Sequence, residues 1–138
     1  MTLRRRMTPV LAAAAAAVAG GCGGQATAGE AERVVEEFYG AVRAGDGDRA
    51  CRLLSAQARS RLESQTSQAC DGVITRLRYS GGDIVDSHVF ITNARVRLRS
   101  GERAFLGRED GRWRLDAIGC NPPPGDPREQ PADCELEA

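Results

Sequence analysis

The hydrophobic positions of the chain follow two different periods, which divide it near residue 78. Before that point apolar residues recur every three or four positions, as on the buried face of a helix. Thr27 and Glu30 have the spacing of a capping box at the start of a first helix, and Gly45-Asp46-Gly47 is expected to end it. Three shorter helices are expected to follow, the second of them capped by Ser55.

After residue 78 apolar and polar residues alternate, which is typical of half-buried β-strands. Ser100-Gly101 and Asp110-Gly111 are two-residue turns of the kind found in tight hairpins. Helices followed by such a sheet predict an α+β domain over residues 30–120. The alternation predicts four antiparallel strands, at 84–91, 94–99, 103–108 and 112–118, and one apolar face made by Ala94, Val96, Leu98, Trp113, Leu115 and Ala117.

Residues 121–138 differ from the domain in composition, since five of the six prolines lie between 122 and 131. Proline lacks the N–H that a helix interior or a central strand needs, so this tail is expected to be an extended arm pinned by Cys134. In an exported chain, four cysteines besides Cys22 allow three disulfide pairings. Cys51–Cys70 and Cys120–Cys134 are favoured, because each partner is the nearest one in sequence.

The first 21 residues have the order of a secretory signal peptide. Three arginines precede the apolar run Val10–Val18, which is too short to span a membrane, and Ala19-Gly20-Gly21 leads into Cys22. A cysteine directly after small residues resembles a bacterial lipobox, in which the cysteine sulfur carries a lipid such as palmitate. The resemblance implies a lipid anchor at Cys22, a flexible tether to residue 29, and a location on the extracytoplasmic face of the cell membrane. General secretion is favoured over the twin-arginine route.

Composition narrows the classes of partner. All 19 basic residues are arginines, and without the signal peptide the mature chain has a net charge of about −3. A weakly acidic protein has no overall field that attracts nucleic acid, so nucleic acid is not an expected partner. No metal or other cofactor is expected, because the chain has a single histidine and no Cys-x-x-Cys pair.

Two segments resemble the NTF2-like domains of actinobacterial secreted lipoproteins. The first is VVEEFY at residues 34–39 with GDGDRACRLLS at residues 45–55, and the second is LGREDGRWRL at residues 106–115. The resemblance covers roughly residues 30–118 and implies a curved sheet wrapped around helices, which together form a cone. In relatives the cone holds an active site, as in SnoaL-like cyclases and ketosteroid isomerases, or a binding site, or is filled with side chains, and the fold alone does not choose among these.

Asp86 and His88 are two residues apart on one predicted strand, so their side chains point to one face, which they share with Ile84 and Phe90. A carboxylate that orients an imidazole is a general-base unit, although a polar pair on a solvated strand gives the same pattern. The resemblance places the first helix along the cone, where the hydroxyl of Tyr39 would donate to an oxyanion. An amphipathic residue at the margin of the core is the alternative for Tyr39.

Alternating arginines form a second candidate surface, on the sheet face opposite the apolar one. Guanidinium groups suit an anionic lipid headgroup or envelope polymer, while a solvated outer face produces the same alternation without a ligand. Glu102 and neighbouring acids are expected to neutralise part of this charge. The arginines are Arg95, Arg97, Arg99, Arg112 and Arg114.

Together these patterns favour a cell-envelope lipoprotein whose NTF2-like domain is a non-catalytic binding or interaction module. Its expected partners are the membrane, through the lipid, and a small ligand or an envelope protein. The alternative is an NTF2-like enzyme of the isomerase, cyclase or hydratase type, in which Asp86, His88 and Tyr39 perform acid–base chemistry in the cone. A domain that only spaces an envelope complex is a third hypothesis.

Overall fold

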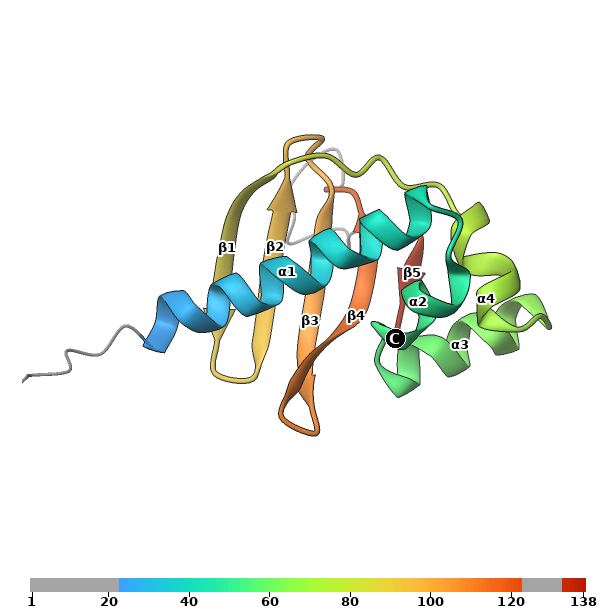
Figure 1. The fold of residues 1–138 in the computed structure, drawn as a ribbon, viewed down its shortest axis with the longest axis horizontal. Coiled ribbons are helices and arrows are strands. Elements are labelled where there is room, and N and C mark those ends of the chain that lie inside the picture. Colours follow the sequence, from blue (N-terminus) through green and yellow to red (C-terminus); the bar gives the residue numbers. More distant parts are fainter. Residues whose placement is uncertain (1–22, 123–132) are drawn as a thin grey trace, which may run out of the picture.

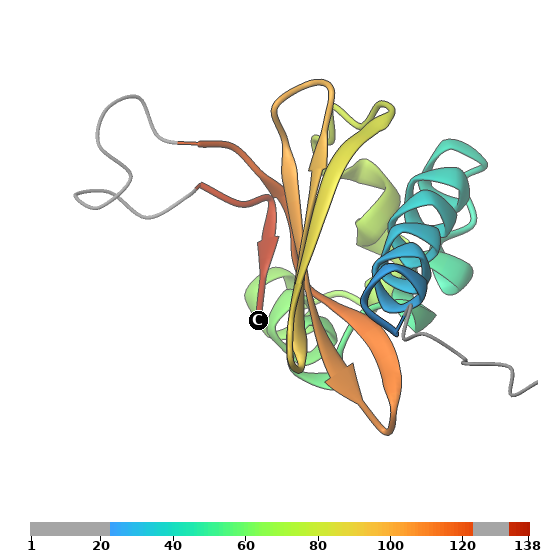
Figure 2. The same cartoon turned by 90° about the vertical axis from the view of Figure 1, so that its left-hand side faces the viewer.

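The computed structural model describes residues 23–122 and 133–138. The expected signal peptide, Cys22 and most of the proline-rich tail lie outside the described residues. Helices occupy the first half of the described chain and an antiparallel sheet the second, so the α+β order is confirmed (Figure 1). One long helix lies across one face of the sheet, and the shorter helices gather at the end of the sheet near the C-terminus (Figures 1 and 2).

Helix α1 (Gly23–Arg43) is longer than the sequence pattern predicts. Its buried stripe includes Ala31, Val35 and Phe38, none of which has exposed surface, at the three- and four-residue spacing of a helix face. The segment up to residue 29, expected to be a flexible tether, is helical from Gly23 onward. A helix that is already nucleated by packing extends at little cost through a segment without proline, which explains the difference.

Helix α1 ends at the glycine that the sequence indicates. Gly45 has a φ of 70°, and this left-handed conformation lets the N–H of Asp46 reach the carbonyl of Ala41 at 2.9 Å. The Asp46 side chain then caps helix α2 (Gly47–Arg52), because its Oδ1 accepts a hydrogen bond from the N–H of Arg49 at 3.0 Å.

Three short helical segments follow, α3 (Ala56–Thr66), α4 (Cys70–Val73) and the 3₁₀ turn η1 (Ile74–Arg76). Ser55 caps α3 as predicted, since its hydroxyl oxygen accepts a hydrogen bond from the N–H of Ala58 at 3.2 Å. A disulfide between Cys51 and Cys70 joins α2 to α4, which confirms the first predicted pairing.

The sheet has one strand more than the four expected. Its strands follow the order of the chain and are antiparallel: β1 (Ile84–Phe90), β2 (Asn93–Leu98), β3 (Arg103–Glu109), β4 (Arg112–Cys120) and β5 (Leu136–Glu137). The extra strand β5 arises because the end of the chain returns to pair with β4, held by the disulfide between Cys120 and Cys134. This disulfide confirms the second predicted pairing.

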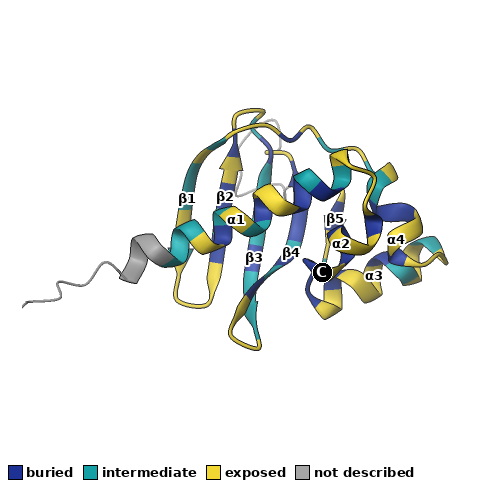
Figure 3. Cartoon of the chain, viewed as in Figure 1, coloured by how far each residue is buried: buried dark blue, intermediate teal, exposed yellow. Residues whose placement is uncertain are grey.

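The core lies between α1 and the sheet face beneath it. Figure 3 shows buried positions on β2 and β4 where α1 crosses them. The backbone of Leu115 in β4 also exchanges hydrogen bonds with Leu53 and Ser55, both at 2.9 Å, which ties the start of α3 to the sheet. All six positions predicted to form the apolar face are at most 7% exposed: Ala94, Val96, Leu98, Trp113, Leu115 and Ala117. None of the helices within the described ranges is long and apolar enough to cross a membrane.

Candidate functional site

The outer face of the sheet, opposite α1, carries most of the candidate side chains. Residues next to one another in a strand point to opposite faces, and Ala94 and Val96 are buried under α1, so Arg95 and Arg97 point outward. Their cross-strand partners share that face. The strand register places these residues in two rows that run across β1, β2 and β3. The first row is His88, Arg95 and Phe105, and the second row is Asp86, Arg97 and Arg103.

The face of Asp86 and His88 differs from the expectation at one end. A β-bulge lies between Ile84 and Asp86, so Ile84 pairs with Leu98 and packs against the core instead of beside the carboxylate. At the other end Phe90 is 58% exposed. Asp86, His88 and Phe90 therefore share one face as expected, whereas Ile84 does not.

Asp86 is an ion-pair partner of Arg97. Its Oδ2 accepts hydrogen bonds from the guanidinium Nε at 2.7 Å and from Nη2. The hydrogen bond from Arg97 lowers the pKa of Asp86, and partial desolvation opposes this. His88 lies farther away, with Nε2 3.8 Å from Asp86 Oδ1, and its ring stacks on Phe90 with centroids 6.3 Å apart. The carboxylate thus orients an arginine rather than an imidazole.

Arg95 and Arg103 flank Phe105 on adjacent strands and have no such partner. Both side chains are half-buried, and the Nε atom of each is shielded from solvent without a hydrogen-bond acceptor in the described part of the chain. With Arg97, which lies opposite Arg103, they form a surface that we call the basic patch. The sequence pattern does not reveal Arg103 as a member of this patch, because the predicted two-residue turn at Ser100-Gly101 would set Arg97 opposite Ala104, whereas the observed register pairs Arg97 with Arg103.

The other three arginines of the predicted stripe lie outside the basic patch. Arg99 follows β2 and lies 3.5 Å from the carboxylate of Asp83. Arg114 donates from Nη1 to the carbonyl of Arg52 at 2.8 Å, and Arg112 is exposed at the β3–β4 turn. Arg112 and Arg114 lie on β4, which β3 separates from β2, so the third member of the basic patch comes from β3.

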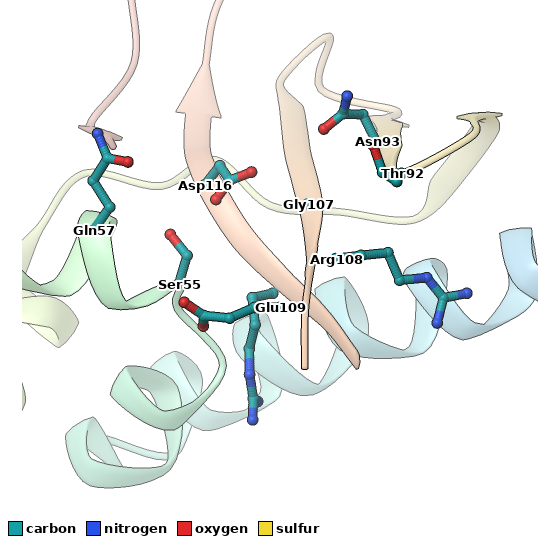
Figure 4. Close-up of a pocket in the computed structure, with 9 residues that line it drawn as sticks. Ser55, Gln57, Thr92, Asn93, Gly107, Arg108, Glu109 and Asp116 are labelled. Atoms are coloured by element: carbon teal, nitrogen blue, oxygen red, sulfur yellow. The ribbon is translucent and has the colours of Figure 1, made fainter. Parts of the chain in front are cut away.

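A polar pocket of about 270 Å³ opens beside the basic patch on the same face (Figure 4). Gly107 makes the hollow, and a Cβ there would lie 2.5 Å from Asp116 Oδ2. Asp116 makes no side-chain hydrogen bond or ion pair within the described residues. Figure 4 shows that the wall comes from three parts of the fold, with Ser55 and Gln57 from the start of α3, Thr92 and Asn93 from the β1–β2 turn, and Glu109 from β3. The pocket offers amide and carboxylate groups to a small polar ligand.

Tyr39 lies on the inner side of the sheet, in the core. It is 4% exposed, and its hydroxyl donates a hydrogen bond to Oε1 of Glu102, which is 1% exposed. Burial is the main cause that raises the pKa of Tyr39, followed by the hydrogen bond to Glu102. Glu102 was expected to neutralise surface arginines, and this expectation is wrong, because its Oε2 accepts from the N–H groups of Ser80 and Gly81 at 2.6 and 3.3 Å.

A groove of about 530 Å³ runs between α1 and β1, with Tyr39 among its lining residues. Its polar groups are Glu36, Arg43 and Asp83, and neither Asp86 nor His88 borders it. The three residues proposed for acid–base chemistry thus lie on two faces of the sheet and share no cavity. Among the described residues, no group of three His, Cys, Asp or Glu side chains could hold a metal ion.

Comparisons with known proteins provide no information about the function of this site. No protein-family model matches the chain, and neither a curated protein nor a solved structure was found to match it.

Proposed function

We propose that this chain is a cell-envelope lipoprotein with an NTF2-like domain, and that this domain is a non-catalytic module binding anionic groups of an envelope component. One observation carries the proposal, namely the shielded and unpaired Nε atoms of Arg95 and Arg103 on either side of Phe105. A shielded guanidinium N–H without an acceptor costs free energy, which would be recovered if the side chain turned to meet a ligand carboxylate or phosphate.

The basic patch is also preorganised for such a ligand. Asp86 fixes the orientation of Arg97, so that less side-chain entropy is lost when an anion binds. Phe105 lies between Arg95 and the next strand and supplies an apolar surface for a sugar or acyl group beside the charge. Three arginines against one carboxylate leave this surface basic, although the mature chain is weakly acidic overall.

The envelope location rests on the sequence and on the two disulfides. Cysteines that pair within 19 and 14 residues, joining α2 to α4 and β4 to the tail, fit an oxidising compartment outside the cytoplasm. The NTF2-like cone is supported by the placement of α1 across the sheet and by the groove beside Tyr39. The enzyme hypothesis gains no such support, because its three residues do not meet.

The binding test is a titration of the mature protein with soluble polyphosphate and, separately, with polygalacturonate, which present phosphate and carboxylate groups. Arg95→Gln/Arg103→Gln should weaken binding of at least one polymer about tenfold or more, since two charge-assisted contacts are lost. The control is Arg33→Gln/Arg76→Gln, which changes the net charge equally at exposed positions outside the patch. Equal loss in both double variants, or no binding by the natural protein, would overturn the proposal.

The anchor is tested separately. Cys22→Ser should move the protein from the membrane fraction to the soluble fraction, and the intact mass of the natural protein should include lipid. Continued membrane association of Cys22→Ser would contradict the lipoprotein assignment without affecting the binding test.

A further inference from the structure

The most exposed apolar side chains of the described residues gather at one turn. Phe90 and Ile91 are 58% and 96% exposed, and they form the end of β1 and the first residue of the β1–β2 turn. Val85, 39% exposed, is the remaining large hydrophobic residue in this class and lies on the same strand. An apolar pair at the tip of a hairpin loses no favourable interaction with water if it enters an apolar phase.

Local folding does not account for isoleucine at this place. Ile91 has a φ of 48°, and a two-residue hairpin loop that begins in the left-handed region normally has glycine there. A β-branched residue is strongly disfavoured in that conformation. Glycine or asparagine would fit the backbone better and would be more soluble, so the apolar side chain of Ile91 needs a reason outside the fold.

The position of the hairpin supplies that reason. Helix α1 begins at Gly23, directly after the proposed lipidated Cys22, so no flexible spacer separates the anchor from the domain. The early part of α1 is connected to the hairpin through Arg108, whose guanidinium lies 3.4 Å from Glu30 and whose N–H donates to the carbonyl of Thr92 at 3.0 Å. Figures 1 and 2 show the beginning of α1 and the β1–β2 turn at the same end of the molecule.

The charges near the turn fit a membrane surface. Between His88 and Arg95 the hairpin contains no acidic residue, and these two basic side chains form the row directly behind the apolar tip. Anionic headgroups attract such a row while the tip enters the acyl boundary. The β3–β4 turn, by contrast, carries Asp110 and no large apolar residue. Of these two turns, the β1–β2 turn is therefore the one with the apolar tip and the absence of acidic residues that contact with an anionic membrane requires.

We infer that the β1–β2 turn inserts Phe90 and Ile91 into the leaflet that holds the Cys22 lipid, which makes the turn a second contact between domain and membrane. This inference rests on the lipid anchor of the proposed function. It fixes the orientation of the domain on the membrane, since a lipid and a hairpin tip together restrict its rotation.

The test places a tryptophan at the tip. Ile91→Trp and, independently, Phe90→Trp are purified from membranes and reconstituted in vesicles of phosphatidylglycerol and phosphatidylethanolamine with brominated acyl chains. Insertion predicts a shift of the added emission to shorter wavelength and its quenching by bromine. Gln65→Trp, exposed on α3 at the other end of the fold, should show neither effect, and the natural Trp113 is 4% exposed and provides the constant background.

The outcomes separate this inference from the anchor on which it rests. If intact mass confirms lipid on Cys22 but neither tip tryptophan is quenched, insertion is wrong and the lipoprotein proposal stands. If Cys22 carries no lipid, a hexahistidine segment replacing residues 1–22 holds the domain on nickel-chelating vesicles, and the same quenching decides the question. Shielding of the tip tryptophan without vesicles, with concentration-dependent self-association, would assign the turn to a second copy of the chain instead.

Discussion

Tyr39 and Glu102, 63 residues apart in sequence, meet in the interior, where the phenol donates a hydrogen bond to the carboxylate. The same carboxylate accepts from the N–H groups of Ser80 and Gly81. One side chain at the start of β3 therefore fastens α1 and the segment that leads into β1. Because this segment borders the groove beside α1, the shape of the groove depends on Glu102, which does not line it.

Glu102→Ala should lower the free energy of unfolding by about 2–4 kcal/mol, because two buried donors and one part-buried donor lose their acceptor. Glu102→Gln keeps one carbonyl oxygen and should cost about 1–2 kcal/mol. Urea denaturation measures both, with Glu36→Ala on the exposed side of α1 as a control that should change stability by less than about 0.5 kcal/mol. A loss no larger than that of the control would mean that the buried carboxylate does not fasten these segments.

Alkaline pH should destabilise the protein through its buried phenols. Burial raises the pKa values of Tyr39 and Tyr79 above the usual 10.0, so the folded chain keeps protons that the unfolded chain releases. The free energy of unfolding should therefore hold below about pH 10 and fall above it, by about 1.4 kcal/mol per pH unit for each tyrosine.

Tyr79→Phe is the matched variant, because the Tyr79 hydroxyl has no hydrogen-bond partner in the described residues. Its stability near neutral pH should change by less than about 0.5 kcal/mol, while the alkaline slope should fall by about half. Denaturant titrations at increasing pH give the slope. A profile that is the same in both proteins would mean that Tyr79 ionises alike in the folded and unfolded chain.

The pKa of Asp86 should depend mainly on Arg97, with smaller effects of His88 and Arg95. The hydrogen bond from Arg97 holds this pKa below the usual 3.8, so the folded form gains stability above that pH and loses it as the pH falls through the lowered value. Arg97→Gln should move the carboxyl titration, followed by NMR, to higher pH. Arg99→Gln, whose guanidinium lies beside Asp83, should leave it unchanged. An unshifted titration in Arg97→Gln would argue against the ion pair.

Ile91→Asn should stabilise the domain in solution by about 0.5–1 kcal/mol, because asparagine tolerates the left-handed backbone better than a β-branched residue. Thr92→Asn, at the adjacent position where φ is not positive, should change stability by less than about 0.5 kcal/mol. Thermal unfolding of the two variants provides the comparison. A loss of stability in Ile91→Asn would show that the isoleucine contributes to folding, which removes the main argument for its role at the membrane.

The features that sequence predicts correctly are those with local causes. Ser55 before a helix, Asp110-Gly111 between strands and the nearest cysteines all act over short stretches of chain, so their neighbours identify them. The alternation of apolar and polar residues also identifies the buried face of β2 and β4, because apolar residues occupy the covered side of each strand.

The features that sequence misses depend on distant partners. Glu102 follows a turn and has the type and place of a surface residue, and only its meeting with Tyr39 explains its burial. Strand β5 has two residues, too few for a pattern, and exists because β4 has a free edge. The bulge before Asp86 shifts Ile84 to the core face, a change that alternation alone does not reveal. The bulge leaves Asp86 and His88 on one face, and it is the position of Tyr39 in the core that separates the three candidate residues.

The disulfide between Cys120 and Cys134 has a consequence for the resistance of the fold to proteolysis. It closes the residues between Cys120 and Cys134 into a covalent ring, and beside it the N–H of Asn121 donates a hydrogen bond to the carbonyl of Asp133. A protease that cuts anywhere within this ring leaves both pieces joined through sulfur, and β5 stays paired with β4. Cleavage there would break a peptide bond without unfolding the domain, so a nicked population can remain folded and retain its surfaces.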